Sequence, residues 1–410
     1  MKILVWGINY APEVTGIGPF NTGLCEYLRA AGHEVEMVTT FPYYPVWKKQ
    51  PQDAGVVWRS ESQNGVVIHR CWHYVPARVR WWRRILHEAS FVLTSLSRVL
   101  TRPRPDLVIA VSPPLLLGPA AWLVSCLRRT RYVFHVQDLQ PDAAIGVGLL
   151  RRGFVTRGLY AVEAFAYRHA WRVSGISQGM IAAFSSKGVD PERQIFFPNG
   201  IRLDAPPARG AFRTRQGFAV DDFLAVYSGN IGVKQGLQLI VRAARLLRQE
   251  RIHIVICGDG AQRDLIAAEA EGLHNVHLLP LLSDPEYREM LSDCDLAIIP
   301  QLAGSGRAFF PSKLLNPLVF GRPVLSVADV DSELARAVAA GGFGCNVLPG
   351  QPEDLANALE RLAAAPAELA AWGRAGRAWV EQFEWDRVLA AFEKTLAGQS
   401  DHRDHDHLPA

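Results

Sequence analysis

Residues 224–249 read LAVYSGNIGVKQGLQLIVRAARLLRQ, and this stretch shows how the chain is built. Its first four residues form a continuous apolar run, which is typical of a strand buried on both faces of a parallel sheet. A turn with three glycines follows, and residues 237–249 then show the apolar spacing of an amphipathic helix. The stretch predicts one strand–turn–helix unit of an α/β fold.

The same unit recurs along the whole chain of 410 residues. Short apolar, β-branched runs that alternate with helical patterns lie at residues 3–6, 34–38, 107–111, 132–136, 172–175, 224–227, 252–256, 276–279, 296–300 and 323–327. This alternation predicts right-handed βαβ units and therefore parallel sheets. There are two such sets, so we expect an α/β fold with two Rossmann-like domains.

The linker between the two sets is predicted at residues 198–215, where Asn-Gly and Pro-Pro pairs interrupt the periodicity. We therefore expect an N-terminal domain at 1–205 and a C-terminal domain at 206–378. A helix at 379–397 is expected to pack back toward the N-terminal domain. The alternating His and Asp residues of 398–410 predict a disordered tail, with metal binding by this tail as the alternative.

Composition and charge narrow the class of protein. The six cysteines show no Cys-x-x-Cys spacing, which argues against a zinc module and against a disulfide framework. The net charge is +10 in residues 1–200 and −6 in residues 201–410, so the first half predicts an anionic partner. We expect no secretion signal at residues 1–7. The uncharged stretch 107–127 contains three prolines and predicts a strand and a helix rather than a membrane span.

Two basic helix starts follow strands of the second domain. Lys234 ends a glycine-rich turn, and Ser312 with Lys313 begins a later helix. A lysine beside helix N-terminal amides favours a diphosphate, although Lys234 read alone is also typical of a solvated surface lysine and Ser312 of an N-cap. The residues expected to bind a nucleotide diphosphate here are Gly229, Asn230, Lys234, Gly258, Ser305, Ser312, Lys313 and Asn316.

The first domain offers a similar loop with weaker chemistry. Gly16 and Gly18 lie between the first strand and the first helix, where backbone amides can meet an anion. The spacing differs from the Gly-x-Gly-x-x-Gly of dinucleotide-binding folds. The loop is therefore interpreted either as part of the ligand site or as a structural turn.

A basic and aromatic segment at residues 78–104 predicts a surface contact. It contains seven Arg against one Glu, and its acceptor or membrane residues are expected to be Arg80, Trp81, Trp82, Arg83 and Arg84. Basic and aromatic residues mixed on one helix suit an anionic membrane interface. The alternatives are a helix that packs its Trp residues inward, or a nucleic-acid surface, for which no binding motif is present.

Several motifs together resemble a known family. They are the opening glycine loop with AGHEV at 31–35, SGN at 228–230 with KQG at 234–236, GDG at 258–260, PSK at 311–313 and FEW at 383–385. These motifs, spread over residues 1–397, are similar to those of family 4 glycosyltransferases. NYAPEVTGIG at 9–18 with PYYP at 42–45 most resembles the colanic-acid and exopolysaccharide type.

The resemblance implies a GT-B fold, a nucleotide-sugar donor in the second domain, an acceptor in the first, and retention of anomeric configuration without a bound metal. It also implies roles for single residues. Lys234 matches the family's phosphate-binding lysine, and Ser312 with Lys313 matches its diphosphate-proximal helix start. His135, followed by Asp138 on the acceptor side, matches the histidine that contacts the transferred sugar.

The chain departs from the family at two positions. Ala308 and Asn316 stand where the family usually has a pair of Glu residues, so the charge-assisted part of the ribose contact is lost, about 1 kcal/mol. Asp-x-Asp pairs of the kind that hold a divalent cation occur at 293–295 and 329–331. The first precedes a predicted strand instead of ending one, and the basic helix starts already supply counter-charge, so we expect no metal and no other cofactor.

The function expected from the sequence is sugar transfer from a nucleotide diphosphate sugar, GDP-fucose by resemblance, to a lipid-linked saccharide during surface polysaccharide assembly. The enzyme is expected in the cytoplasm, peripherally bound to the inner face of the cytoplasmic membrane, with no nucleic-acid partner. The alternatives are a nucleotide-sugar epimerase of the same fold, and a catalytically silent, membrane-associated saccharide-binding protein.

Overall fold

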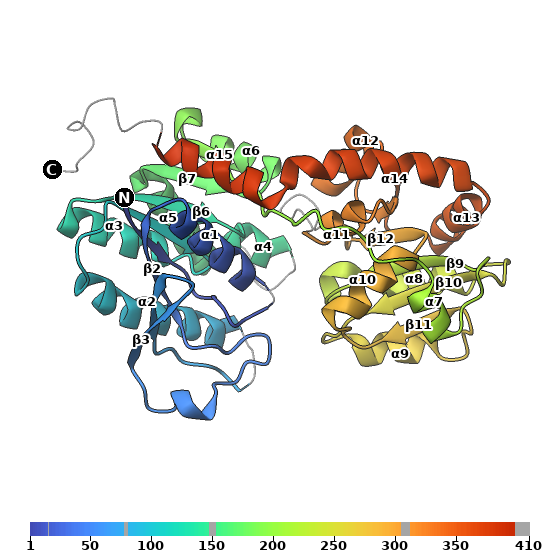
Figure 1. Cartoon of the computed structure of the whole chain (residues 1–410), viewed down its shortest axis with the longest axis horizontal. Coiled ribbons are helices and arrows are strands. Elements are labelled where there is room, and N and C mark those ends of the chain that lie inside the picture. The colour runs from blue at the N-terminus through green and yellow to red at the C-terminus, as the bar shows by residue number, and fades with distance from the viewer. Residues whose placement is uncertain (15, 78–80, 147–152, 305–311, 398–410) are drawn as a thin grey trace. The chain divides into compact units, whose positions relative to one another are not determined.

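The computed structural model describes residues 1–14, 16–77, 81–146, 153–304 and 312–397. The chain forms two compact units (Figure 1). The first comprises Met1–Gly200 together with the segment that begins at Asp386, and the second comprises Ile201–Trp385. The boundaries therefore lie at residues 200 and 385, beside the expected 205 and 378.

The first unit is built on an eight-stranded sheet with the order β3-β4-β2-β1-β5-β6-β7-β8. All neighbouring pairs are parallel except β3 and β4, which form an antiparallel hairpin at the edge. Its strands are β1 Lys2–Trp6, β2 Glu34–Thr40, β3 Trp58–Gln63, β4 Val66–Cys71, β5 Leu107–Ser112, β6 Arg131–Val136, β7 Arg172–Gly175 and β8 Gln194–Phe196.

Helices that connect these strands pack on the sheet of the first unit. They are α1 Gly18–Ala30, α2 Trp81–Leu100, α3 Leu117–Arg128, α4 Gln140–Gly146, α5 Phe154–His169 and α6 Gln178–Ser186, with short turns η1 Pro51–Asp53 and η2 Pro191–Arg193. The last helix, α15 Trp385–Ala397, joins them from the far end of the chain. The Phe392 ring of α15 stacks on Phe197 at 3.9 Å, and its Glu393 carboxylate contacts Tyr27 and His33.

The second unit has a six-stranded sheet that is parallel throughout, with the order β11-β10-β9-β12-β13-β14. Its strands are β9 Phe223–Ser228, β10 Ile252–Cys257, β11 Val276–Leu279, β12 Leu296–Pro300, β13 Val324–Val327 and β14 Gly344–Val347. Its helices are α7 Ala211–Gln216, α8 Gln238–Ala244, α9 Arg263–Ala270, α10 Asp284–Asp293, α11 Leu315–Val319, α12 Glu333–Gly341, α13 Pro352–Ala363 and α14 Pro366–Val380, with turns η3 Val233–Gln235, η4 Ser312–Leu314 and η5 Glu381–Phe383.

Alternate residues of the central strand explain why the second sheet is covered on both faces. Ala225 and Tyr227 of β9 belong to one apolar core, whereas Leu224 and Val226 belong to another. Successive side chains of a strand point to opposite faces, so a continuously apolar strand requires helices on both sides. This arrangement leaves the ends of the strands, where loops meet helices, as the place for polar chemistry.

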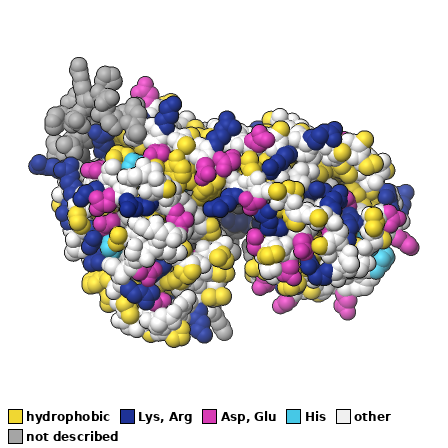
Figure 2. Space-filling model, viewed as in Figure 1, with side chains coloured by type: hydrophobic (Ala, Val, Ile, Leu, Met, Phe, Trp, Pro, Cys, Tyr) yellow, Lys and Arg dark blue, Asp and Glu magenta, His cyan; other side chains and the backbone are white. Residues whose placement is uncertain are grey.

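The viewed face of the surface carries charged side chains of both signs. Hydrophobic, basic and acidic side chains are interspersed over each unit (Figure 2). The charge difference between the two halves of the sequence is therefore spread out in this view.

Candidate active site

A half-buried lysine marks the carboxyl end of the second sheet. The Nζ of Lys313, at the start of η4–α11, donates to the Tyr227 hydroxyl at 2.6 Å. That hydroxyl in turn donates to the Asn230 carbonyl oxygen at 2.6 Å, so the direction of both hydrogen bonds is fixed. Burial lowers the pKa of Lys313 to about 8. Among the described residues no carboxylate forms an ion pair with this ammonium, which makes it a cation without a counter-ion.

Glycine is required where the lysine crosses the turn after β9. Gly229 has φ +130°, and a Cβ atom there would collide with the side chain of Lys313. Gly258 lies directly beside it, because a Cβ on Gly258 would overlap the Gly229 carbonyl. The predicted turn residues thus allow two loops and a lysine side chain to share one small space at the ends of β9 and β10.

Neutral hydroxyl and amide groups lie next to this lysine. The Tyr287 hydroxyl of α10 is 3.3 Å from the Ser228 hydroxyl. Burial raises the pKa of Tyr287 to about 12, while hydrogen bonds with Ser228 and Asn316 oppose the shift. Asn316 therefore has a protein partner in this structure, and the Tyr287–Asn316 pair offers uncharged hydrogen-bonding groups beside Ser228, the residue that precedes Gly229.

The other predicted residues of the second unit lie around the same strand ends. Lys234 is in η3, and its carbonyl oxygen accepts from the Leu302 amide at 2.8 Å, which joins the loop after β9 to the loop after β12. Ser312 begins η4. Ser305 lies outside the described residues.

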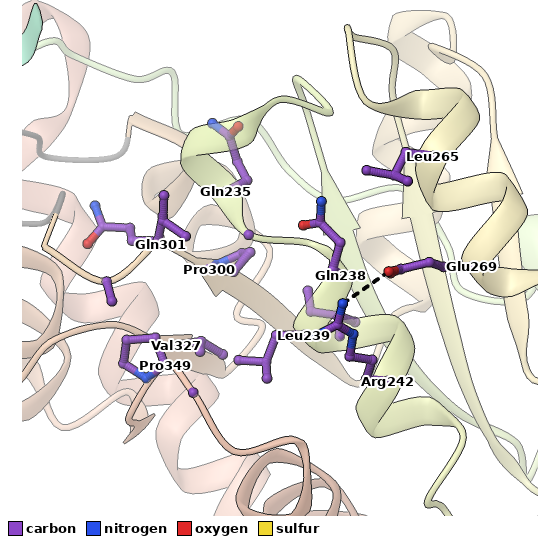
Figure 3. Close-up of a pocket in the computed structure, with 15 residues that line it drawn as sticks. Gln235, Gln238, Leu239, Arg242, Leu265, Glu269, Pro300, Gln301, Val327 and Pro349 are labelled. Atoms are coloured by element: carbon purple, nitrogen blue, oxygen red, sulfur yellow. Dashed lines mark hydrogen bonds and ion pairs between the residues drawn. The ribbon is translucent and has the colours of Figure 1, made fainter. Parts of the chain in front are cut away.

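A pocket of about 430 Å³ opens beside Lys234 at the ends of β12 and β13 (Figure 3). Amide side chains and aliphatic side chains alternate on its wall, and an ion pair of 3.2 Å joins Arg242 to Glu269 at one side. Its lining includes Gln235, Gln238, Leu239, Pro300, Gln301, Val327 and Pro349. Sequence reasoning did not assign these glutamines to the site, because a single glutamine carries no signal of its own.

In the first unit, His135 is sealed inside the protein. It stands opposite Val111 of β5 and Ser174 of β7, and only 2% of it is exposed. Its Nδ1 is 2.8 Å from the Ser174 hydroxyl and its Nε2 is 2.8 Å from the Gln137 side chain. Burial lowers its pKa to about 3. Both ring nitrogens therefore have protein partners, which is the geometry of a structural histidine.

The Glu13 carboxylate joins the two stretches that carry the closest family resemblance. One oxygen accepts from the amides of Tyr43 and Tyr44 at 2.9 Å, and the other accepts from the Asn9 side chain at 2.7 Å. Gly18 is needed because a Cβ there would lie 2.8 Å from the Glu13 carbonyl, and Gly16 packs against the Tyr44 ring with φ +68°. In this structure the two glycines thus serve loop packing.

The basic segment forms the start of α2. Arg84 pairs with Glu88 at 3.1 Å. Asp138 is half-buried after β6, and its negative charge helps to raise the pKa of Arg84. The Arg83 guanidinium lies over the Trp82 ring at 5.0 Å, and Trp82 is 42% exposed. Trp81 is the first residue of α2, and Arg80 lies outside the described residues. The outward face also exposes Ile85, Leu86 and Leu93, while Phe91, Val92 and Val99 are buried.

Comparison with known proteins identifies the family. Residues 15–200 match the family described as Glycosyl transferase 4-like domain, and residues 209–379 match Glycosyl transferases group 1. The chain is 35% identical over 363 residues to the putative colanic acid biosynthesis glycosyl transferase WcaI of Escherichia coli K12, covering 85% of this chain and 87% of that protein. The chain belongs to glycosyltransferase family 4. The family prediction and the prediction of an enzyme are confirmed.

Solved glycosyltransferase structures share the fold of this family 4 member. Sucrose-phosphate synthase from Thermosynechococcus elongatus matches with a TM-score of 0.75 at 19% identity, covering 97% of this chain and 98% of that chain. WaaG, a glycosyltransferase involved in lipopolysaccharide biosynthesis, matches with a TM-score of 0.66 at 17% identity, covering 97% and 100%. HepE of Anabaena, solved in complex with UDP, matches with a TM-score of 0.70 at 16% identity over the same shares. The predicted GT-B fold is confirmed.

The acidic pairs of this glycosyltransferase hold its backbone together. The Asp293 carboxylate accepts from the amides of Gly210 and Arg213, and Asp295 pairs with the Arg213 guanidinium at 2.7 Å. Asp329 accepts from the Gly304 amide at 2.6 Å. Within the described ranges no group of three or more His, Cys, Asp and Glu is arranged to hold a metal ion, and no helix is long and apolar enough to cross a membrane.

Proposed function

We propose that this family 4 glycosyltransferase moves a sugar from a nucleotide diphosphate sugar to a lipid-linked saccharide during surface polysaccharide biosynthesis. The observation that carries the proposal is the Lys313 ammonium, which lies half-buried at the carboxyl end of a parallel sheet and has no carboxylate partner among the described residues. A partly desolvated cation without a counter-ion favours an anionic ligand, and a diphosphate supplies two charges at this position. The names of WcaI and of the HepE complex with UDP support the same class of reaction and donor.

The chemistry expected of the residues follows from charge. As the bond between the sugar and the diphosphate breaks, negative charge grows on the leaving phosphate, and Lys313 with Lys234 would stabilise that charge. We propose that no metal takes part, since these lysines provide the counter-charge. Retention of configuration, with a donor phosphate oxygen as the base toward the acceptor hydroxyl, is proposed from the family resemblance.

The donor is tested by titrating UDP, GDP, ADP and their common sugar conjugates, GDP-fucose first, and following thermal stability. A ligand at 100 times its Kd stabilises the protein by about 2.7 kcal/mol. Lys313→Ala should weaken binding of the selected nucleotide about 100-fold, roughly 2.7 kcal/mol, because the diphosphate loses its charge partner. Exposed Lys394→Ala is the matched control. Unchanged affinity in Lys313→Ala would remove the lysine from the site.

Lys234→Ala, alone and combined with Lys313→Ala, tests whether both lysines bind the same diphosphate. If both lysines contact one diphosphate, the double variant should lose less affinity than the two single losses added together. Strict additivity would place the two lysines on separate ligands.

Membrane association is proposed for α2. Replacing Arg80, Arg83 and Arg84 by Ser should release the enzyme from vesicles that contain anionic lipid, since each basic side chain near such a surface contributes about 1 kcal/mol. The matched control replaces Arg242, Arg361 and Arg374 of the second unit by Ser. Equal vesicle binding of both triple variants at low ionic strength would reject the role of α2. We propose a cytoplasmic enzyme that acts at the inner face of the membrane.

Product analysis separates the alternatives. Conversion of one nucleotide sugar into another without an acceptor would identify an epimerase. Nucleotide or saccharide binding without any turnover would identify a silent binding protein.

A further inference from the structure

Four rings gather at the carboxyl edge of the first sheet, where open α/β sheets bind their ligands. We call Tyr43, Trp47, His73 and His87 the aromatic–imidazole cluster. Tyr43 follows β2, His73 follows β4, and His87 lies on α2. The Tyr43 ring is 4.9 Å from the His73 ring and 4.7 Å from the His87 ring, and the two imidazoles are 5.1 Å apart.

Three of the four ring nitrogens of the two imidazoles lack hydrogen-bond partners. His73 is fully buried, and neither of its ring nitrogens has a partner of normal geometry. His87 is 1% exposed, its Nδ1 donates to the Tyr74 carbonyl oxygen at 2.6 Å, and its Nε2 has no partner. Because a carbonyl oxygen only accepts, Nε2 of a neutral His87 must carry an unused lone pair. Buried polar atoms without partners are uncommon and costly, about 1–3 kcal/mol each.

The charge state narrows what could satisfy these nitrogens. Burial holds the pKa of His73 well below its ordinary value, and the neighbouring His87 and Lys49 act in the same direction, while the Cys71 carbonyl opposes them. Burial likewise lowers the pKa of His87 to about 4. Two neutral imidazoles do not attract an anion, and no third His, Cys, Asp or Glu among the described residues completes a metal site with them. The complementary group is a hydroxyl, which donates to one nitrogen and accepts from another.

The rings around the imidazoles favour a particular kind of hydroxyl compound. A saccharide combines hydroxyl groups with apolar C–H surface, and the faces of Tyr and Trp match that surface. The edge of the cluster is polar, because the Asn9 side chain reaches the Tyr43 hydroxyl and Glu88 lies nearby. Glu88 in turn accepts from the Gln140 side chain at 3.2 Å.

Trp47 is the most exposed member of the cluster. Its ring lies 5.4 Å from Tyr43 and 5.2 Å from His87. Unlike the other three members it is only half-buried, and it follows the exposed residue Val46. Its backbone has φ +52°, an unfavourable conformation for a bulky residue, so this position gains stability if the loop changes conformation.

We propose that Trp47 covers a saccharide subsite whose floor is formed by Tyr43, His73 and His87, and that a saccharide ring enters by displacing the indole. The hydroxyls of the ring then hydrogen-bond the imidazole nitrogens. The inference rests on the proposed function in one respect, namely that the ring belongs to the acceptor. The proposal places the sugar of the acceptor against the neutral groups of the cluster. The basic start of α2, which is proposed to face the membrane, is a separate surface.

The test measures saccharide binding directly, without any need for donor turnover. Saturation-transfer NMR on the full chain uses the methyl glycosides of glucose, galactose, mannose and fucose, each as both anomers. At least one glycoside should bind the wild type. Trp47→Gly, which removes the indole and suits the positive φ, should bind it severalfold more tightly. His73→Phe should bind it at least tenfold more weakly.

Controls separate the outcomes. His169→Phe changes a histidine that contacts Trp122 and Phe165 elsewhere in the same unit, and it should bind like the wild type. His73→Leu replaces His73→Phe if the larger ring prevents folding, and hydrogen exchange of peptides from the first unit reports the folded state of each variant. Failure of every glycoside to bind both wild type and Trp47→Gly would overturn the proposal, as would undiminished binding in His73→Phe and His73→Leu. Either result would leave an ordered water as the partner of the imidazoles. Glycoside binding by a protein that turns over no nucleotide sugar would overturn the proposed function and leave the subsite in place.

Discussion

The two units place opposite chemistry at equivalent ends of their sheets. In the second unit the candidate site centres on one ammonium, Lys313, surrounded by glycine turns and a tyrosine hydroxyl. In the first unit the corresponding edge carries neutral histidines and aromatic rings. The difference supports the proposal that the charge of the second unit serves a diphosphate, whereas the first unit offers hydrogen bonds and apolar contact. Each prediction below tests one side of that contrast.

The largest expected effect concerns acid stability. Three histidines of the first unit, His73, His87 and His135, are buried with lowered pKa values. In the unfolded chain each takes up a proton below a pH of about 6.5, but in the folded chain it stays neutral. The contribution of these histidines to the free energy of unfolding is therefore fully present above that pH and is lost as the pH decreases. The loss is up to about 1.4 kcal/mol per pH unit for each histidine, or about 4 kcal/mol per pH unit for the three together. In the second unit only His277 shows such a lowered pKa among the described residues.

Hydrogen exchange read by mass spectrometry between pH 7 and pH 5 tests this difference unit by unit. Peptides of the first unit should lose protection first. His73→Phe should reduce the pH dependence of the first unit by about one third. Loss of protection at the same pH in both units would contradict the contrast.

His135→Ala tests whether His135, near the end of β6, has a structural role or a role in turnover. From its burial and its two partners we expect the free energy of unfolding to fall by about 2–4 kcal/mol, through a cavity and through the loss of the hydrogen bonds to Ser174 and Gln137. Gln137 keeps its hydrogen bonds with Asn199, so the Ser174 hydroxyl is the group left without a partner. Urea unfolding measures this effect. The family resemblance predicts instead a 10- to 1000-fold loss of turnover, about 1.4–4 kcal/mol. Turnover per folded molecule, measured well below the melting temperature, decides between them, and His135→Gln should recover part of either loss.

Sequence patterns predicted the second unit better than the first for a physical reason. The strand at Leu296–Pro300 is as expected, because a strand buried on both faces must be apolar throughout. The edge hairpin β3–β4 was not predicted, since four of the six residues of β3 are exposed and its sequence WRSESQ is largely polar. Gly229 and Lys313 could be predicted because each lies at a turn next to a buried strand or helix.

The first unit's edge could not be predicted in the same way. His73 and His87 are fourteen residues apart on different elements, and nothing in the sequence says that their rings meet. The missed residue with the clearest signal is Tyr227, a polar-tipped residue near the carboxyl end of a buried strand, directly before the glycine turn. The contact between the loop at 9–18 and the segment at 42–45 could have been suspected only because both stretches resemble the same family. The hydrogen bonds from the Tyr43 and Tyr44 amides to Glu13 now explain why the two stretches occur together.

Alkaline pH should weaken donor binding in the second unit. Lys313 must be protonated to pair with a diphosphate, and its pKa of about 8 in the free protein means that the cation is lost as the pH rises above that value. Nucleotide affinity should then fall toward tenfold, about 1.4 kcal/mol, for each further pH unit. Lys313→Arg keeps its charge at these pH values and should give a flat profile between pH 8 and pH 9.5. Calorimetric titration with UDP or GDP checks both proteins, and a decline of equal slope in Lys313→Arg would assign the effect to another group.

The smallest expected effect concerns a carboxylate introduced at position 316 of the second unit. Asn316 shares a hydrogen bond with the Tyr287 hydroxyl, where the family usually has Glu. Asn316→Glu should strengthen binding of the free nucleoside about fivefold, roughly 1 kcal/mol, because an ionised carboxylate accepts from ribose hydroxyls more strongly than an amide does. The nucleoside diphosphate should gain less, since the new carboxylate also repels the phosphates that Lys313 attracts. Titrating uridine and UDP, or guanosine and GDP, against both proteins separates these terms. Tyr287→Phe in each background is the control: if Asn316 only anchors Tyr287, then Asn316→Glu will change the free energy of unfolding and leave nucleoside affinity as it was.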